Sequence, residues 1–372
     1  MISFVWEPGL PLPAGTGGSE NYTIGQVREL TRRGLAAQVV TIGVGAADGR
    51  DDFPGIPFRS LAGVDQVVTL DGIVVFVTDF PVVATPRTAY QFLHVPPPLR
   101  DRHRARMLDQ TRDRGLIATS NFAAGLWADF LDVDLATVRV VYPFAEPCFA
   151  RQPRTPTTRA TRVLYAGRLS PEKGIYTLLA MLHSDLIASD LELTFTATTS
   201  GADKPQGAII HQLLQAHPAI RVVPARKTPA AMAALMAEHD VVLMPSNSQY
   251  WHETFGIVSV EAQHAGCRVV ASDDGGLPET DCGTITLVPP DNAEALAQGL
   301  LRAMALGPAT PADRTSAAAR FTVGQSVDDL LAVFARPLPA TPATVVRELE
   351  AIAILPLAAP TRPSQSAPAG AL

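Results

Sequence analysis

Short apolar blocks of strand length recur along the chain, and segments with helical periodicity separate most of them. Within each block the apolar residues are nearly continuous instead of alternating with polar ones. This pattern is typical of parallel strands whose sheet is covered on both faces. The blocks are too numerous for one ordinary doubly wound sheet, so two sheets are expected. The strands predicted in this way are residues 2–6, 39–44, 73–77, 116–118, 138–141, 163–166, 191–195, 220–223, 241–244, 269–271 and 285–288.

A polar, proline-bearing segment at residues 151–159 interrupts this pattern, which then restarts with a strand, a glycine and a helix. The chain is therefore predicted to have an α/β fold with two Rossmann-like, doubly wound domains, residues 1–150 and residues 151–336. Ligands of such open sheets bind at the carboxyl ends of the strands, so a cleft between the domains is the expected site. Residues 337–372 are predicted to form a proline-rich joint, a helix around residues 343–354 and a disordered tail.

Composition and charge exclude several classes of protein. The 372 residues are 47% hydrophobic and 18% charged, which suits about two soluble globular domains. No apolar run approaches the roughly 20 residues of a membrane span, and Met1 leads into a strand-like segment without a charged leader, so a cytoplasmic location is expected. A net charge of −6 gives no general attraction to nucleic acid or anionic membranes. Nucleic acid is not predicted as a partner, and a peripheral membrane contact has no support.

The three cysteines, Cys148, Cys267 and Cys282, form no closely spaced pair of the metal-ligand type. Their odd number also argues against a disulfide framework. They are expected to be reduced and structural, and no metal site is predicted.

The most informative stretch of the chain is residues 251–261, where two carboxylates eight positions apart bracket a glycine. The apolar block before it and the apolar helical face after it predict a strand, a loop and a helix. Free backbone N–H groups and the positive end of the helix dipole meet at Phe255, Gly256 and Ile257, where glycine lets a phosphate approach the main chain closely. A diphosphate group is therefore predicted to bind there.

The two carboxylates, Glu253 and Glu261, flank this predicted phosphate site. Glu261 lies one to two turns inside the helix, so at about 1.5 Å per residue it is displaced from the loop by roughly the span of a nucleoside diphosphate. One carboxylate is then placed to hold a ribose and the other a hexose. The alternative is that both are ordinary surface glutamates, because an isolated glutamate is usually solvated.

Arg168 and Lys173 follow the first predicted strand of the second domain. Arginine offers a fork of donors to phosphate and lysine offers a compact charge, so together they would neutralise a departing nucleoside diphosphate without a metal ion. Lysine is otherwise confined to Lys204 and Lys227, which makes Lys173 stand out. The alternative is a pair of exposed charges at the start of a helix.

In the first domain, Gly17 and Gly18 follow the first strand and precede a segment with helical character, where a glycine pair permits close backbone approach. A glycine cluster alone is equally typical of a flexible turn. His94 ends a predicted strand or loop and is followed by prolines, so it is a candidate to face the reaction centre, with a purely structural role as the alternative. Asp79 is a further candidate.

Residues 163–280 resemble glycosyltransferase family 4, and a looser resemblance covers roughly residues 1–335. The shared features are two glutamates separated by seven residues, Gly-Arg-Leu and Glu-Lys-Gly around Arg168 and Lys173, and a glycine pair before Leu277-Pro278-Glu279. The resemblance implies a GT-B fold and a retaining, metal-independent glycosyltransferase without a cofactor. Such an enzyme would move a sugar from a nucleoside-diphosphate sugar, with a UDP-sugar as the expected donor, to a hydroxyl group of a small molecule or glycan.

The same resemblance implies a role for each candidate residue. Arg168 and Lys173 would stabilise the leaving diphosphate, Glu253 would position sugar hydroxyls, and Glu261 would bind the ribose. His94 would lie near the donor sugar. The other residues implied to bind the donor are Gly17, Gly18, Thr254, Phe255, Gly256 and Ile257.

Two segments depart from the family pattern. Residues 141–146 replace an Ile-Pro-Asn-Gly-Val stretch that many members have, which puts the acceptor contacts of the first domain in question. Residues 196–201 replace a glycine-rich turn, which does the same for the loop that contacts the base. In the family the chain often crosses back to the first domain near its end, and residues 320–335 are expected to begin that return.

Asp132 and Asp134 form the Asp-x-Asp triplet of metal-dependent, single-domain glycosyltransferases, but they lie far from the phosphate motif and are interpreted as a turn or helix cap. The main alternative function is a non-catalytic sugar-nucleotide-binding subunit of a larger assembly. A nicotinamide-dependent oxidoreductase would need a Gly-x-Gly-x-x-Gly turn that opens a helix, with an acid roughly 20 residues later, and this combination is absent. No pattern in the sequence indicates the oligomeric state.

Overall fold

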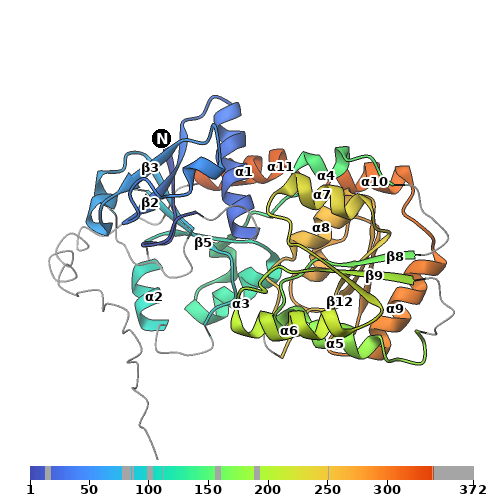
Figure 1. The fold of residues 1–372 in the computed structure, drawn as a ribbon. Coiled ribbons are helices and arrows are strands. Elements are labelled where there is room, and N and C mark those ends of the chain that lie inside the picture. Colours follow the sequence, from blue (N-terminus) through green and yellow to red (C-terminus); the bar gives the residue numbers. More distant parts are fainter. Residues whose placement is uncertain are drawn as a thin grey trace, which may run out of the picture. The chain divides into compact units, whose positions relative to one another are not determined.

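Two parallel β-sheets form the framework of the protein (Figure 1). The computed structural model describes residues 1–12, 18–77, 85, 88–98, 104–111, 113–155, 161–187, 193–249, 251–336 and 338, without the side chains of residues 106, 109 and 110. The chain divides into a unit that spans Met1–Pro339 and a second that spans Ala340–Leu372, and both sheets belong to the first. The helix predicted around residues 343–354 and the predicted tail lie outside the described residues.

The first sheet has the strand order β3-β2-β1-β4-β5-β6-β7. Together with the helices α1 to α3 and α11 it makes up what we call the first lobe. Its strands are β1 (Ile2–Val5), β2 (Ala37–Ile42), β3 (Phe58–Leu61), β4 (Ile73–Phe76), β5 (Ala89–Leu93), β6 (Gly115–Ala118) and β7 (Val138–Val140), and its helices are α1 (Gly18–Arg32), α2 (Arg104–Thr111), α3 (Asn121–Leu131) and α11 (Val323–Phe334).

The strand β3 of this sheet was not predicted, and β5 was predicted only as a strand or loop that ends at His94. The edge strand β3 is only partly buried and carries Arg59 and Ser60, so it lacks a continuous apolar run. The central strand β5 is fully buried but holds Gln91, whose side-chain oxygen accepts a hydrogen bond from Arg114 Nη1 at 3.0 Å. Gln91 therefore interrupts the continuous apolar block that marks the other buried strands, and its hydrogen bond with Arg114 satisfies it inside the sheet.

The second sheet has the order β10-β9-β8-β11-β12-β13 and, with helices α4 to α10, makes up the second lobe. Short 3-10 helices lie at Arg50–Asp52, Val64–Thr69, Leu135–Thr137, Pro171–Lys173 and Leu277–Thr280. The strands of the second sheet are β8 (Thr161–Tyr165), β9 (Leu193–Thr198), β10 (Ile220–Val223), β11 (Val241–Met244), β12 (Arg268–Ser272) and β13 (Ile285–Val288). The helices are α4 (Pro147–Arg151), α5 (Ile175–Met181), α6 (Pro205–Ala216), α7 (Pro229–Ala237), α8 (Ile257–His264), α9 (Ala293–Ala305) and α10 (Pro311–Ala318).

Helices cover both faces of the second sheet, as its apolar strands predict. Along β11, Val242 and Met244 join a core with α7, α8 and α10, while Val241 and Leu243 join a second core with α5, α6 and α9. Successive side chains of a strand point to opposite faces, so a strand with a core on each side must be apolar throughout. The continuous apolar blocks of the sequence have this cause.

Helix α11 returns from the second lobe to the first. Its residues Val327, Leu330 and Val333 are buried in the core that includes Phe4 and Val39 of the first sheet. This matches the return expected for residues 320–335. The helix therefore packs with the first lobe although it lies within the range 151–336 predicted for the second domain.

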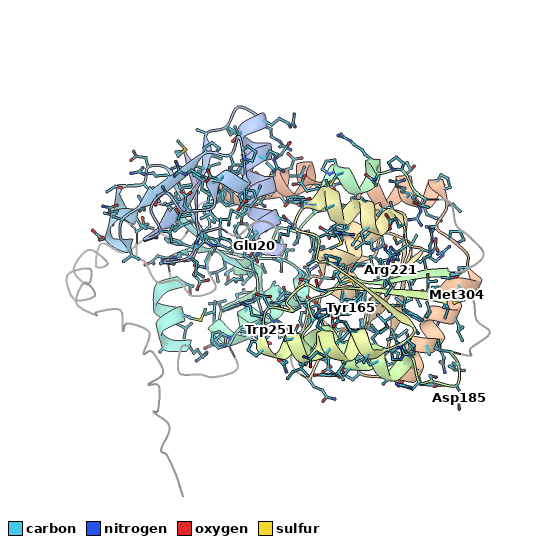
Figure 2. The ribbon with its side chains drawn as sticks, in the orientation of Figure 1. Glu20, Tyr165, Asp185, Arg221, Trp251 and Met304 are labelled. Atoms are coloured by element: carbon cyan, nitrogen blue, oxygen red, sulfur yellow. The ribbon has the colours of Figure 1, made fainter. Side chains whose placement is uncertain are left out.

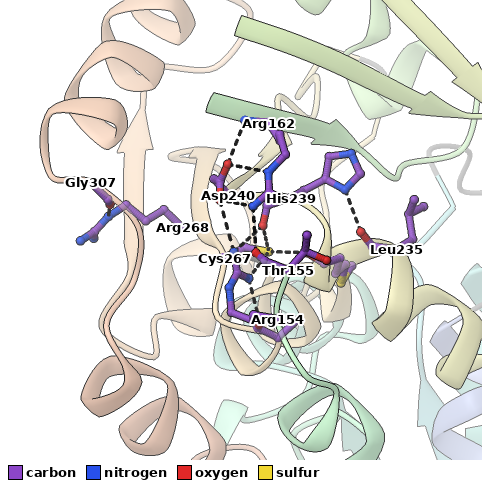
Figure 3. A network of polar contacts seen from close by, with 11 residues as sticks. Arg154, Thr155, Arg162, Leu235, His239, Asp240, Cys267, Arg268 and Gly307 are labelled. Atoms are coloured by element: carbon purple, nitrogen blue, oxygen red, sulfur yellow. Dashed lines mark hydrogen bonds and ion pairs between the residues drawn. The ribbon is translucent and has the colours of Figure 1, made fainter. Parts of the chain in front are cut away.

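A polar network anchors the segment between the sheets to the second lobe (Figure 3). Arg154 donates from Nη1 to the carbonyl of Ala265 at 2.9 Å and from Nη2 to that of His239 at 2.7 Å. Arg162 forms a two-point ion pair with the carboxylate of Asp240 at 2.9 and 3.0 Å. Asp240 precedes β11, so this network lies at the amino end of the sheet and leaves the carboxyl ends of the strands for ligands.

Among the described residues, no helix combines the length and the apolar character that crossing a bilayer would require. Asp132 and Asp134 occupy the capping positions expected for them. Asp132 is the left-handed C-cap of α3, with φ at 57°, and the side chain of Asp134 accepts a hydrogen bond from the backbone of Ala136 at 2.9 Å.

Candidate donor-sugar site

The predicted site residues of the second lobe lie where the order of the strands reverses. In the second sheet this switch point falls between β8 and β11. The segment after β8 carries Arg168 and Lys173, and the segment after β11 carries Glu253 and the start of α8. Open α/β sheets bind ligands at this position.

The start of α8 is built for close approach of a ligand to the backbone. Gly256 has φ at +94°, and a Cβ atom added there would lie 2.5 Å from Cδ2 of Leu277, so a larger residue would be both strained and crowded. Helix α8 then begins at Ile257, and its N-cap residue, Gly256, has no side chain to cap it; no capping side chain is seen among the described residues. The first N–H groups of the helix and the positive end of its dipole are therefore left for an anion.

The glycine pair at Gly275 and Gly276 packs against the backbone of the loop that carries Glu253 and Thr254. Gly276 donates its N–H to the carbonyl of Glu253 at 2.8 Å. A Cβ atom at Gly275 would overlap the carbonyl of Glu253, and one at Gly276 would overlap that of Thr254. The sequence marked this pair only as part of a motif, and the structure gives it a packing role that needs residues without side chains.

Lys173 and Glu253 form an ion pair between the two loops. Ser246 also donates from Oγ to the same carboxylate oxygen of Glu253 at 3.2 Å. Burial raises the pKa of Glu253, but the charge of Lys173 and the hydrogen bonds from Lys173 and Ser246 outweigh it, so the pKa lies below its ordinary value. Glu253 is therefore ionised at neutral pH, and the ion pair holds Lys173 beside the loop after β11.

The turn that carries Lys173 is fixed by Tyr165 (Figure 2). The hydroxyl of this buried tyrosine lies 2.8 Å from the carbonyl of Arg168 and 3.2 Å from that of Lys173. Gly174 follows with φ at +68°, and a Cβ atom there would overlap the carbonyl of Pro245. The lysine turn and the loop after β11 are thus packed backbone against backbone.

Arg168 keeps an exposed side chain, 3.6 Å from the carboxylate of Glu172. Its positive charge also lowers the pKa of Glu20, which lies at the start of α1 in the first lobe and is labelled in Figure 2. Burial raises the pKa of Glu20, and a backbone hydrogen bond and the charge of Arg168 offset only part of this rise. The long ion pair with Glu172 leaves most of the guanidinium exposed, so its other N–H groups can reach phosphate oxygens.

Glu261 has surroundings opposite to those of Glu253. It is 7% exposed, and within the described part of the chain its carboxyl group has no hydrogen-bond or ion-pair partner. Burial, and then repulsion from Glu146, raise its pKa from 4.5 to about 8. Glu146 itself pairs with Nη1 of Arg28 at 2.8 Å. Cys148 lies near both carboxylates, and burial with these charges raises the pKa of its thiol to about 11.

Parts of the first lobe reach the same loop. A Cβ atom on Gly18 would lie 3.4 Å from Cγ2 of Ile257, so the start of α1 contacts the start of α8. The carbonyl of His94 accepts a hydrogen bond from Oγ1 of Thr254 at 2.6 Å. Gly17 and Asp79 lie outside the described residues.

The imidazole of His94 is buried between aromatic rings. Its centroid lies 5.2 Å from that of Phe92 and 5.4 Å from that of Tyr22. Burial lowers its pKa to about 4, so the ring is neutral at physiological pH. Its Nε2 has no hydrogen-bond partner among the described residues. Such an unpaired buried nitrogen is costly, and a ligand hydroxyl would satisfy it.

Residues 160–305 match the family model described as "Glycosyl transferases group 1". This part of the chain is therefore similar to that family of glycosyl transferases. A D-inositol 3-phosphate glycosyltransferase from Jonesia denitrificans is 32% identical over 186 residues, which cover 47% of this chain and 42% of the relative. A lipopolysaccharide 1,2-N-acetylglucosaminetransferase from Salmonella typhimurium is 32% identical over 154 residues, or 39% of this chain and 40% of the relative. The chain thus spans less than half the length of these relatives.

Solved glycosyltransferase structures share the fold across both lobes. A glycosyltransferase from Rickettsia africae superimposes with a TM-score of 0.72 at 17% identity and covers 90% of this chain and 97% of its own. Anabaena Alr3699/HepE in complex with UDP-glucose gives a TM-score of 0.71 at 20% identity, with 90% and 99% covered. These likenesses confirm the GT-B fold that the sequence predicts.

The Leu277-Pro278-Glu279 motif has a role in this chain that the sequence did not reveal. Glu279 of this motif accepts hydrogen bonds from the backbone N–H groups of Asn121 and Phe122, at 2.9 and 2.8 Å, at the start of α3 in the first lobe. It also accepts one from the hydroxyl of Tyr142 at 2.8 Å. Ser120, which caps α3, donates to the carbonyl of Thr254. The N-terminus of α3 thereby links the first lobe by hydrogen bonds to the second-lobe segments that carry Thr254 and Glu279.

Proposed function

We propose that the protein is a glycosyltransferase that moves a sugar from a nucleoside-diphosphate sugar to a hydroxyl acceptor, without a metal ion and with retention of configuration. One observation carries this proposal. The uncapped N-terminus of α8 lies between a carboxylate paired with Lys173, Glu253, and an unpaired buried carboxyl group, Glu261. An anion site flanked by two hydroxyl-binding groups is complementary to a sugar nucleotide, in which a diphosphate joins two sugars.

The positive groups of the site would act on the leaving group. As the glycosidic bond breaks, negative charge grows on the diphosphate, and Arg168, Lys173 and the N-terminus of α8 stabilise it. In a cleft with little water this stabilisation is worth several kcal/mol. Three fixed positive groups supply the neutralisation that a divalent ion supplies elsewhere, which supports a metal-independent reaction.

The two glutamates would hold the two ends of the donor. Ionised Glu253 accepts hydrogen bonds from sugar hydroxyls and keeps Lys173 in place. Glu261 with its raised pKa is neutral at pH 7, so its carboxyl group both donates to and accepts from the ribose hydroxyls. The unpaired Nε2 of His94 is available to a donor-sugar hydroxyl. A UDP-sugar is the proposed donor, because HepE of the same fold binds UDP and UDP-glucose.

Retention is proposed because the resemblance to glycosyltransferase family 4 implies it, and neither glutamate of the proposed site is assigned the role of a covalent nucleophile. Glu253 is committed to Lys173, and Glu261 is displaced to the ribose end. We infer that the acceptor hydroxyl attacks from the side of the leaving group, and that the leaving phosphate takes its proton. The acceptor is proposed to be a small molecule or glycan, since the named relatives act on inositol phosphate and lipopolysaccharide.

Thermal-shift measurements against UDP-, GDP-, ADP- and TDP-sugars test the donor. The matching nucleotide sugar is expected to raise the melting temperature by mass action, and Glu261→Ala is expected to reduce that shift. Slow donor hydrolysis by the purified chain would exclude the alternative of a non-catalytic binding subunit. If no nucleotide sugar stabilises the protein, the proposed function is wrong.

A further inference from the structure

A histidine and aspartate pair lies beside Glu253, and none of the roles above uses it. His252 precedes Glu253 in the chain, and its Nδ1 lies 2.9 Å from both carboxylate oxygens of Asp274. The side chain of Asp274 is 13% exposed, whereas that of His252 is 42% exposed. The pair therefore consists of a covered carboxylate and an open imidazole.

The carboxylate determines which nitrogen of His252 carries the proton. Because a carboxylate only accepts hydrogen bonds, Nδ1 of the neutral imidazole is the nitrogen that donates to Asp274. Nε2 then keeps a free lone pair, and within the described part of the chain it has no hydrogen-bond partner. A lone pair held in a fixed direction at an open position is an acceptor for a ligand hydroxyl.

One aromatic ring lies beside this imidazole, and an exposed tryptophan precedes it in the chain. The ring of Phe122, in the first turn of α3, lies 5.5 Å from the imidazole centroid. Trp251, labelled in Figure 2, precedes His252 and is 40% exposed, while the other two tryptophans, Trp6 and Trp127, are 8% and 1% exposed. An exposed indole next in sequence to a hydroxyl acceptor offers an apolar surface and a polar group, and a pyranose has apolar C–H faces and polar edges.

The backbone around these side chains is anchored on both sides. Asn247 donates its N–H to the carbonyl of Glu172, in the lysine turn, at 2.9 Å. Trp251 donates its N–H to the carbonyl of Asn247 at 3.3 Å. Asp274 holds His252 from the end of β12. Groups fixed before binding lose little freedom when a ligand arrives, so this arrangement suits recognition.

We propose that His252, oriented by Asp274, accepts a hydrogen bond from a sugar hydroxyl beside Glu253, and that Trp251 packs against the same sugar. The inference rests on the proposed function for the carbohydrate nature of the ligand. The ligand is a hydroxylated pyranose, which the donor or the acceptor supplies. Asp274 is a positioning residue that acts through His252.

Two variants separate this role from a structural one. His252→Ala removes the acceptor, and Asp274→Asn keeps the shape but offers an amide donor to Nδ1, which moves the imidazole proton to Nε2. His183→Ala is the control, since His183 is exposed on the second lobe. In ¹⁵N-histidine-labelled protein, the imidazole shifts report the Nδ1–H tautomer of His252 in the wild type and the Nε2–H tautomer in Asp274→Asn.

Acrylamide quenching of tryptophan fluorescence reports the bound sugar, because Trp251 is the exposed tryptophan. UDP, UDP-glucose, D-glucose and the donor found by thermal shift are the probes. His252→Ala and Asp274→Asn are expected to weaken sugar-dependent protection about five- to tenfold, as loss of one hydrogen bond does, and to leave UDP binding unchanged. A loss with the nucleotide sugar assigns the site to the donor, and a loss with D-glucose alone assigns it to the acceptor.

Unchanged sugar affinity in both variants overturns the inference, as does a wild type in which no probe protects Trp251. These outcomes differ from a failure of the proposed function. If UDP and every nucleotide sugar fail to stabilise the wild type, the function is wrong. Suppose instead that a nucleotide sugar binds, and that both this sugar and D-glucose have the same affinity for the wild type and for His252→Ala. Only the role of His252 is then wrong.

Discussion

Glu253 and Glu261 bracket the start of the same helix, yet they lie in opposite electrostatic environments. Glu253 is paired with Lys173 and receives a hydrogen bond from Ser246, and its pKa is lowered. Glu261 has no partner in the described chain, lies near Glu146, and has its pKa raised to about 8. Both carboxyl groups are largely covered, so burial alone does not separate them. The sign of the neighbouring charge does.

This difference suggests two ways of preparing a site for a sugar nucleotide. On the Glu253 side the ion pair exists before any ligand arrives, so Lys173 is already placed for the charge that develops on the diphosphate. On the Glu261 side a buried carboxyl group without a partner waits for hydroxyls to satisfy it. The first region is suited to act on the transition state and the second to act on binding.

The largest expected effect is that of Lys173→Ala on turnover. We expect kcat to fall about 10²- to 10³-fold with a much smaller change in donor affinity, because the charge that Lys173 meets is greater in the transition state than in the ground state. Steady-state kinetics of donor hydrolysis or transfer measures this. Lys204→Ala, at an exposed lysine, is the control and should resemble the wild type. Equal losses in kcat and in affinity would contradict the assigned role.

The next effect concerns the stability of the lysine turn. Gly174 and Gly307 have the same φ of +68°, but a Cβ atom at Gly174 would overlap the carbonyl of Pro245, whereas nothing lies within 4 Å of one at Gly307. Gly174→Ala should therefore lower the free energy of unfolding by about 3 kcal/mol or more, and Gly307→Ala by about 1 kcal/mol. Urea denaturation of both variants checks the difference. Similar losses would mean that backbone strain, and not the packing of the two loops, dominates.

A smaller effect is expected for the ribose side. Glu261→Ala should raise the Michaelis constant for the donor about tenfold and leave kcat nearly unchanged, because it removes hydrogen bonds made equally before and during the reaction. Glu261→Gln is the matched variant, since an amide resembles the neutral carboxyl group in size and polarity, and it should lose less. An unchanged constant in Glu261→Ala would remove ribose binding from Glu261.

The sequence predicts the second lobe well because its strands are apolar on both faces and its site residues lie within short motifs. Glu253, Gly256 and Lys173 lie in short motifs, and the resemblance to glycosyltransferase family 4 marks them as candidates. Contacts between distant segments are not marked in this way. Neither the proximity of Glu146 to Glu261 nor the capping of α3 by Glu279 leaves a local pattern. Each depends on how the lobes and helices pack, and Glu279 was visible only as part of a motif.

The last effect is a pH dependence between pH 5 and pH 8, which the Glu261 side should show and the Glu253 side should not. In the unfolded chain Glu261 ionises near its ordinary pKa of 4.5, whereas in the folded protein it keeps its proton up to about pH 8. Between these values the folded state binds more protons than the unfolded state, so its stability falls as pH rises, by up to about 1.4 kcal/mol per pH unit from this group. Above pH 8 the contribution is constant.

Glu261→Gln removes this titration and isolates it. The difference in unfolding free energy between the wild type and Glu261→Gln, measured by urea denaturation from pH 5 to pH 8, should move steadily against the wild type. Glu146→Gln should shorten the pH range over which stability falls. Loss of the neighbouring charge lowers the folded-state pKa of Glu261, while burial still keeps it above 4.5. A difference that does not vary with pH would mean that Glu261 is ionised in the folded protein, and the contrast with Glu253 would then be lost.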